Sequence, residues 1–115
     1  MTKIKLEWEK KMNYLKKYGI TQEEITELKE IYNENIIKFI KENEIFITEK
    51  LEYLKNENYI IYPILKNNIR IFLELIYVLK EKNKIMKEKG FSKKHIQMIL
   101  MDERLYSDIK ISKGM

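Results

Sequence analysis

Lysines crowd one stretch of this 115-residue sequence in a pattern that could bind phosphate groups. Residues 79–100 contain seven lysines and two glutamates, and Gly90 and Ser92 divide the stretch. Glycine commonly follows the end of a helix and serine commonly caps the start of the next, so the stretch predicts a helical hairpin. The candidate nucleic-acid-binding residues are Lys80, Lys82, Lys84, Lys87, Lys89, Lys93 and Lys94, with support from Lys10, Lys11, Lys16 and Lys17.

Two of these lysines stand where a helix does not favour positive charge. Lys93 and Lys94 would occupy the first turn after Ser92, where the helix dipole is already positive and each lysine costs a few tenths of a kcal/mol. A phosphate bound at that helix start would reverse the sign of the effect. The alternative is that the lysines form a solvated helix face or pair with acids inside the fold. The acids considered for that pairing are Glu23, Glu24, Glu27, Glu30 and Glu34.

No residue pattern indicates catalysis. The chain has no cysteine, its one histidine is His95, and its three glycines are isolated rather than grouped in a phosphate-binding loop. The adjacent acids Asp102 and Glu103 would point to different sides of a helix and suit no metal geometry. We therefore expect no enzymatic activity, no cofactor and no metal site.

Tyrosines offer a second route to nucleic acid, because aromatic rings can stack on bases. Most of the eight tyrosines fall at or beside predicted core positions, so packing is the default interpretation. Tyr18 and Tyr106 lie at the ends of predicted elements and are expected to be freer.

Composition indicates one folded domain over residues 1–115, with 44% hydrophobic and 36% charged residues. The net charge is +5, and it is unevenly spread: residues 1–17 sum to +4, residues 18–61 to −5 and residues 62–115 to +6. This balance permits a polyanionic partner. The start of the chain lacks the apolar core of a secretory signal, and no 18-residue apolar run is present. We expect a cytoplasmic protein with no membrane partner.

The apolar spacing predicts an all-α fold. An amphipathic helix is expected over residues 3–17, ending near Gly19, and a Thr21–Glu24 capping box should begin a second helix whose buried stripe runs to Ile40. A third helix is expected after Thr48. The last helix should cover residues 93–101, followed by a short turn at 103–107 and a frayed tail at 110–115.

Two interpretations compete for residues 63–89. Apolar residues and Asn83 follow heptad spacing from Tyr62 to Met86, which would suit one long helix from Pro63 to Lys89. The alternative is a break near Asn67-Asn68 or near Leu73, and the repeat described next favours it. A parallel homodimer through this segment would oppose lysine to lysine, so a partner of Asn83 is expected to be acidic and to come from the chain's own second helix or from another protein.

Three stretches of the sequence can be aligned on their glycines. They are KMNYLKKYGITQEEI (residues 11–25), KLEYLKNENYIIYPI (residues 50–64) and KNKIMKEKGFSKKHI (residues 82–96). Gly19, Asn58 and Gly90 coincide in this alignment, and an apolar residue follows each of them. Each row predicts a helix that ends at a residue tolerant of positive φ, and then a second helix. The fold expected is five or six helices arranged as two or three stacked helical hairpins.

The segments LKKYGITQEEI and MKEKGFSKKHIQMIL resemble the repeats of the mitochondrial transcription termination factor (mTERF) family, and MDERLYS resembles the closing turn of such a repeat. The resemblance covers most of residues 8–107. It implies a helical solenoid that binds nucleic acid along a basic concave face, in a form with few repeats.

These observations favour a small, basic, non-enzymatic protein that binds DNA or RNA through phosphates with little sequence specificity. The alternative is a protein-binding adaptor or inhibitor, of the kind phages and plasmids carry, that docks helix faces on a partner with an acidic surface. The two hypotheses differ in what the lysines face. A continuous solvent-exposed stripe would favour nucleic acid, and acids of this or another chain would favour the adaptor.

Overall fold

The structure, a computed structural model, describes residues 10–111. Residues 3–9 of the helix expected at 3–17, and residues 112–115 of the tail expected to fray at 110–115, lie outside these residues. The prediction of an all-α fold is confirmed, since the described residues form helices and no strand. The helices are η1 (Asn13–Tyr18), α2 (Gln22–Ile31), α3 (Glu34–Glu42), α4 (Glu44–Asn56), α5 (Ile61–Asn67), α6 (Arg70–Leu73), α7 (Ile76–Glu88), α8 (Lys93–Leu100) and α9 (Glu103–Ser107). No helix in this part of the chain combines the length and the apolar character needed to cross a membrane.

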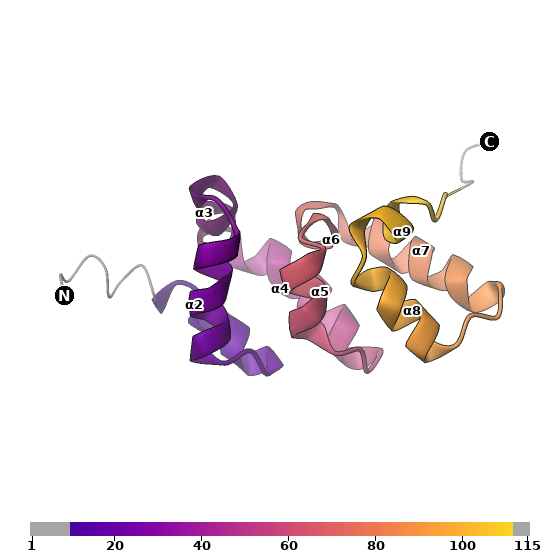
Figure 1. Ribbon diagram of the computed structural model, residues 1–115, viewed down its shortest axis with the longest axis horizontal. Helices are drawn as coiled ribbons and strands as arrows, with labels where there is room; N and C mark the ends of the chain where they lie inside the picture. The colour runs from indigo at the N-terminus through magenta and orange to yellow at the C-terminus, as the bar shows by residue number, and fades with distance from the viewer. Residues whose placement is uncertain (1–9, 112–115) are drawn as a thin grey trace.

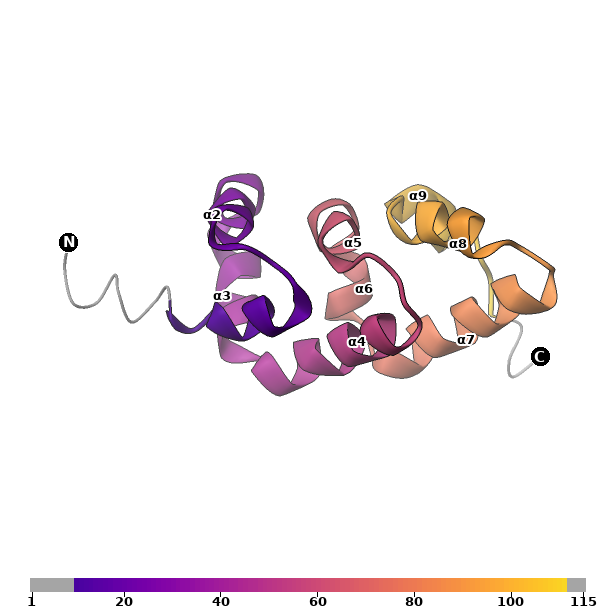
Figure 2. The same cartoon turned by 90° about the horizontal axis from the view of Figure 1, so that it is seen from below.

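The helices form three consecutive units along an elongated molecule of 51 × 27 × 22 Å (Figure 1). The first unit contains η1, α2 and α3, the second α4, α5 and α6, and the third α7, α8 and α9. Figure 2 shows α4 and α7 along one side of the molecule and α2, α5 and α8 along the other. The first and third units therefore lie at opposite ends, with the second unit between them.

Each unit turns at a residue with positive φ, at the three positions that the sequence alignment brought together. The φ angles are 83° at Gly19, 64° at Asn58 and 82° at Gly90. We call residues 16–23, 55–62 and 87–94 the first, middle and third corners. In the middle and third corners the residue after the turn donates its N–H five residues back, from Tyr59 to Leu54 at 3.0 Å and from Phe91 to Met86 at 3.1 Å. This is the Schellman arrangement, which satisfies carbonyls at the helix end.

The expected count of five or six helices is wrong, because several predicted helices are divided. The helix predicted after Thr21 has the capping box, with Thr21 and Glu24 each accepting from the other's backbone N–H. It ends at Ile31, however, and Asn33 caps α3 by accepting from the N–H of Ile36 at 3.0 Å. The apolar stripe continues through this break, because both helices bury residues in the same core.

The long helix considered for residues 63–89 is also wrong, and both proposed break points are used. The chain leaves the helical region at Asn68 (φ −144°, ψ 69°) and again at Glu74 (φ −96°, ψ 166°). The Asn68 side chain is fully buried and donates to the carbonyl of Leu100 at 3.0 Å, a contact that a continuing straight helix would not make. The breaks fold the apolar residues back onto the core instead of presenting them along one exposed stripe.

Some helix ends lie where the sequence predicts them, and others do not. Ser92 accepts from the N–H of His95 at 3.1 Å, as predicted, and α8 ends at Leu100. The expected cap at Thr48 is wrong, because α4 begins at Glu44, directly after Asn43. The predicted turn at 103–107 is the short helix α9, capped by Asp102.

One lysine lies in the core rather than on the surface. Lys50 is fully buried; its ammonium donates to the carbonyl of Phe46 at 2.9 Å and lies 3.0 Å from the centre of the Phe46 ring. Loss of water lowers the Lys50 pKa to about 8. This lysine aligns with Lys82 of the third unit, which is also turned inward, as described below.

Candidate functional site

The third corner gathers four of the candidate lysines at one place. Lys87 lies at the end of α7, Lys89 precedes Gly90, and Lys93 and Lys94 begin α8. All four are exposed. With Glu88 as its one acid, the corner has a net charge of +3 over eight residues, whereas the middle corner sums to zero and the first to +1. The third unit as a whole (residues 75–111) has nine lysines and arginines against five acids.

The start of α8 differs in charge from the start of α2. In α2 the first turn carries Glu23 and Glu24, and the helix dipole favours their negative charge at this end of the helix. In α8 the positions aligned with these glutamates are Lys94 and His95, and the first turn has no acid. Ser92 satisfies one backbone N–H at this end, and the lysines add positive charge beside the others. The third corner is therefore more favourable to an anion than the same place in the first unit.

The ammonium group of Lys87 contacts an acid of the neighbouring unit. It forms an ion pair with Glu57, the residue before the turn of the middle corner. The hydrogen bond from Lys87 is the largest cause holding the Glu57 pKa below its usual range, and the same bond raises the Lys87 pKa. The Lys87 side chain remains 54% exposed, so the pair lies at the surface and contributes modestly to stability.

Asn83 completes this junction beneath the ion pair. Its amide donates to the Tyr53 hydroxyl at 2.7 Å and to Glu57 at 3.0 Å, and its carbonyl oxygen accepts from the Tyr59 hydroxyl at 2.8 Å. Asn83 is almost fully buried. One of its partners is acidic, as expected, but this acid is Glu57 at the end of α4 and not an acid of the second helix or of another protein. The network fixes the third unit against the middle corner.

Lys80, Lys82 and Lys84 lie on α7 before the third corner, and Lys84 is one turn from Lys87. Lys82 is directed inward, since it donates to the carbonyl of Tyr106 at 3.0 Å and lies 4.2 Å from the centre of that ring. Desolvation lowers its pKa. Lys80 is exposed and 5.9 Å from the Tyr53 ring centre, and Lys84 is exposed.

The supporting lysines of the first unit lie at the far end of the molecule. Lys16 and Lys17 are in the last turn of η1, and Lys10 and Lys11 precede that helix; all four are exposed. The second unit separates them from the third corner (Figure 2). The structure therefore joins four of the candidate lysines in one corner, extends that group along α7 through Lys84 and Lys80, and leaves the lysines of the first unit apart from them.

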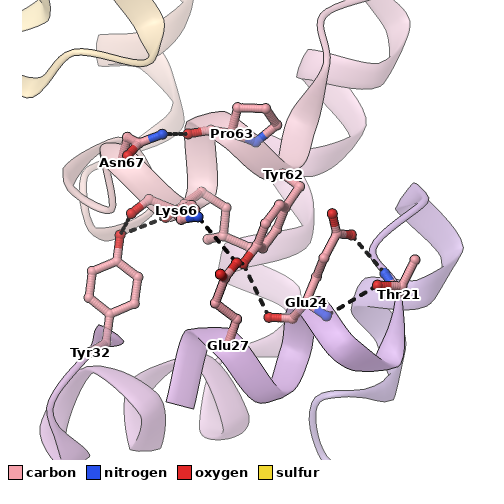
Figure 3. A network of polar contacts seen from close by, with 9 residues as sticks. Thr21, Glu24, Glu27, Tyr32, Tyr62, Pro63, Lys66 and Asn67 are labelled. Atoms are coloured by element: carbon pink, nitrogen blue, oxygen red, sulfur yellow. Dashed lines mark hydrogen bonds and ion pairs between the residues drawn. The ribbon is translucent and has the colours of Figure 1, made fainter. Parts of the chain in front are cut away.

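One acid of α2, Glu27, contacts the second unit instead of the lysines of α7 and α8. Figure 3 shows Glu27 with two partners from α5: the Tyr62 hydroxyl, which donates to it, and Lys66, whose ammonium lies 3.3 Å away. The Tyr32 hydroxyl donates to the carbonyls of Leu65 and Lys66 at 2.7 and 2.6 Å. The ion pair of Lys87 is with Glu57, at the end of α4, and not with an acid of α2.

The tyrosines are used mainly for packing. Tyr106, expected to be free, is fully buried, and burial raises its pKa. Tyr18 is half-buried, and its hydroxyl donates to Glu52 at 2.6 Å; loss of water, together with this bond, raises the Tyr18 pKa to about 12. The prediction that Tyr18 and Tyr106 are free of packing contacts is wrong, because each of them contacts a segment that is distant in sequence.

Lys55 is a basic corner residue that the sequence-based selection missed. It is exposed, lies in the last turn of α4 and aligns with Lys16 and Lys87. The alignment of the three rows was the signal that could have found it. Its surroundings differ from those of the third corner, because Glu52 and Glu57 lie at the same helix end.

The described residues contain no group of three or more histidine, cysteine, aspartate or glutamate side chains placed to hold a metal ion. His95 stacks on Phe91 with ring centres 4.4 Å apart, at the outer side of the third corner. Comparisons with protein-family models, with curated proteins and with solved structures find no match to this chain.

Proposed function

We propose that this protein is a small nucleic-acid-binding protein without enzymatic activity and that the third corner is its principal contact with phosphates. The observation that carries the proposal is the meeting of Lys87, Lys89, Lys93 and Lys94 around Gly90, with all four side chains exposed. A phosphate beside the start of α8 would interact with lysine ammonium groups and with the positive end of the helix together.

The chemistry of this corner suits the nucleic-acid backbone better than the bases. Lysine ammonium groups are compact point charges that bind phosphates without the two-point geometry that arginine uses to recognise guanine. The corner contains no arginine, asparagine or glutamine, and its aromatic residue, Phe91, is half-buried against His95. We therefore expect binding that depends on salt and varies little with sequence. The mTERF-like segments support the same proposal, since members of that family bind nucleic acid.

Fluorescence anisotropy across a salt series tests the proposal, with labelled duplex and single-stranded oligonucleotides of mixed sequence. We expect binding at about 50 mM salt that weakens as salt rises, with a slope of about −0.9 per phosphate contacted in duplex DNA. Reversing three charges, in the variant Lys89→Glu, Lys93→Glu and Lys94→Glu, should remove most of the affinity. Absence of binding by the wild type at low salt would refute the proposal.

The variant Lys93→Glu with Lys94→Glu, which leaves Lys89 at the end of α7 unchanged, supports a second measurement that separates function from folding. Replacing Lys93 and Lys94 by acids places favourable charge at the start of α8, so the folded state should gain a few tenths of a kcal/mol per residue. A variant that is at least as stable as the wild type and yet binds poorly would show that the lysines serve a ligand. Loss of both properties together would point to unfolding instead.

A further inference from the structure

Two open grooves meet at the start of α4, on the side of the molecule away from α2, α5 and α8. One, of about 520 Å³, lies between α4 and the first turns of α7. The other, of about 650 Å³, lies between the end of α3 and the start of α4. Both include Glu44, Ile45 and Glu49, so they form one continuous depression, which we call the α4 trough.

The trough combines apolar surface with negative charge. Ile45 is 84% exposed, the highest value among the large apolar side chains of the described residues, and Phe46 and Ile76 line the grooves on either side of it. Four carboxylates surround these residues, and Lys80 is the one cation among the residues that line the trough. The carboxylates belong to Glu42, Glu44, Glu49 and Glu52.

We propose that the α4 trough docks a basic amphipathic helix of a partner protein. An exposed apolar residue between two grooves suits the apolar anchors that such a helix presents at spacings of three and four residues. The carboxylates would attract lysines or arginines on the flanks of that helix and steer its approach. The same carboxylates repel nucleic acid, so this surface is independent of the third corner, and either proposal can fail alone.

Charge and burial argue against a second copy of this chain as the occupant. The helix with the most lysines among the described residues, α7, uses its apolar residues Leu79 and Met86 within its own core, where both are buried. The third corner offers lysines but only the half-buried Phe91 as an apolar anchor. Met98 on α8 and Tyr77 on α7 are single exposed apolar residues, so no basic helix among the described residues presents a row of apolar anchors.

The test uses a labelled 15-residue peptide of leucine and lysine, with leucines at helical spacing, and fluorescence anisotropy at about 50 mM salt, where charge attraction is weakly screened. A control peptide has the same composition with leucine and lysine alternating. Because the protein has a net charge of +5, its overall charge repels both peptides, and binding has to come from a local acidic surface. We expect the helical peptide to bind more tightly than the control.

Two matched substitutions locate the binding. Ile45→Lys changes the most exposed apolar residue of the trough, and Met98→Lys makes the same kind of change on α8, where Met98 is 54% exposed. We expect Ile45→Lys to weaken peptide binding at least about tenfold, the scale of a central interface residue, and Met98→Lys to leave it unchanged. Both positions are exposed, so neither change should unfold the protein, which circular dichroism would confirm.

Three results would overturn the proposal: equal binding of the two peptides, no binding of the helical peptide, or an equal loss in both variants. Sedimentation of the protein alone tests the remaining occupant. Oligomers that form in the wild type and disappear in Ile45→Lys would show that the trough binds a second copy, and would equally overturn the proposal of a partner helix.

Discussion

The middle and third corners have the same backbone and different charges. In each, the residue at positive φ donates its N–H to the carbonyl three residues back at 3.0 Å, and the following aromatic residue closes the longer bond of the Schellman arrangement. The middle corner places Glu57 before the turn and Ile61 and Tyr62 after it. The third corner places Lys89, Lys93 and Lys94 at the same three positions. The same turn geometry thus lies between two units in the middle corner and at one end of the molecule in the third corner.

The two corners also differ in how their second helices begin. The backbone of Ile60, before α5, is held by Gln97, which accepts from the N–H at 2.8 Å and donates to the carbonyl oxygen at 3.0 Å. The corresponding residue of the third corner, Ser92, caps its own helix and leaves the lysines beside it exposed. Contact with a neighbouring unit occupies the middle corner, whereas in the third corner Lys87 is paired with Glu57 and Lys89, Lys93 and Lys94 are exposed to a ligand. The shape of a repeat therefore says less about function than the side chains that the repeat leaves exposed.

The largest effect is expected from breaking the junction that ties the two corners together. Replacing Asn83 with alanine would leave the buried hydroxyl of Tyr59 without its acceptor and remove the donor shared by Tyr53 and Glu57. We expect the free energy of unfolding to fall by about 2–3 kcal/mol. Urea denaturation measures this, with the exposed Asn35→Ala as the control. A loss below about 0.5 kcal/mol would mean that the network is not important for stability.

The second effect compares charge reversals of equal size in different units. The variant Lys93→Glu with Lys94→Glu changes the third corner, and Lys38→Glu with Lys55→Glu makes the same change in net charge in the first two units. Under the proposed function, the first pair should weaken nucleic-acid binding about tenfold or more and reduce the salt slope by about two, because two phosphate contacts are lost. Equal losses in the two variants would indicate that net charge alone matters and not the corner.

The third effect compares the two turn residues. Gly90→Ala should lower the free energy of unfolding by about 1 kcal/mol, because an added Cβ disfavours positive φ. The space around Gly90 is open, since a Cβ added there would meet no other part of the protein within 4 Å, so the cost is that of the backbone conformation. Asn58→Ala should cost less, because the residue replaced already has a Cβ. Thermal unfolding of both variants gives the order, and a larger loss at Asn58 would contradict it.

The smallest effect concerns the ion pair that joins the corners and depends on pH. Because the folded-state pKa of Glu57 is lowered, chiefly by Lys87, its contribution is present above the unfolded pKa of about 4.3 and is lost as pH falls through the folded value. Glu57→Gln should therefore reduce stability near neutral pH by an amount on the order of 0.5 kcal/mol, and the difference from wild type should shrink below about pH 4. Glu88→Gln, at the exposed third corner, is the control. A difference that stays constant with pH would exclude the ion pair as its source.

Local signals predicted the corners well. Gly19 and Gly90 identify turns because glycine adopts positive φ freely, and the alignment extended the same conformation to Asn58. The caps at Thr21 and Ser92 follow from side chains that reach only three residues along the chain. These features depend on neighbours in sequence, so a single sequence contains the information for them.

The breaks within apolar stretches were harder to predict. Within residues 63–89 the sequence offered breaks near Asn67-Asn68 and near Leu73, but the apolar pattern continues through both and also suits one long helix. At Asn68 a distant segment contributes, through the bond from its side chain to Leu100. The same limit applies to the candidate site. Lys82 has a sequence context similar to that of its neighbours, and its inward direction depends on Tyr106, twenty-four residues away.

The two hydrogen bonds between the Gln97 side chain and the backbone of Ile60 have a consequence for solubility. Residues 59–62 read Tyr-Ile-Ile-Tyr, a composition that favours β pairing, and Ile60 is 67% exposed in an extended conformation (φ −82°, ψ 117°). An extended residue with free backbone groups can recruit the same segment of another molecule, as an unprotected sheet edge does. The glutamine amide occupies both backbone groups of Ile60, so one side chain of the third unit shields the most aggregation-prone tetrapeptide of the second.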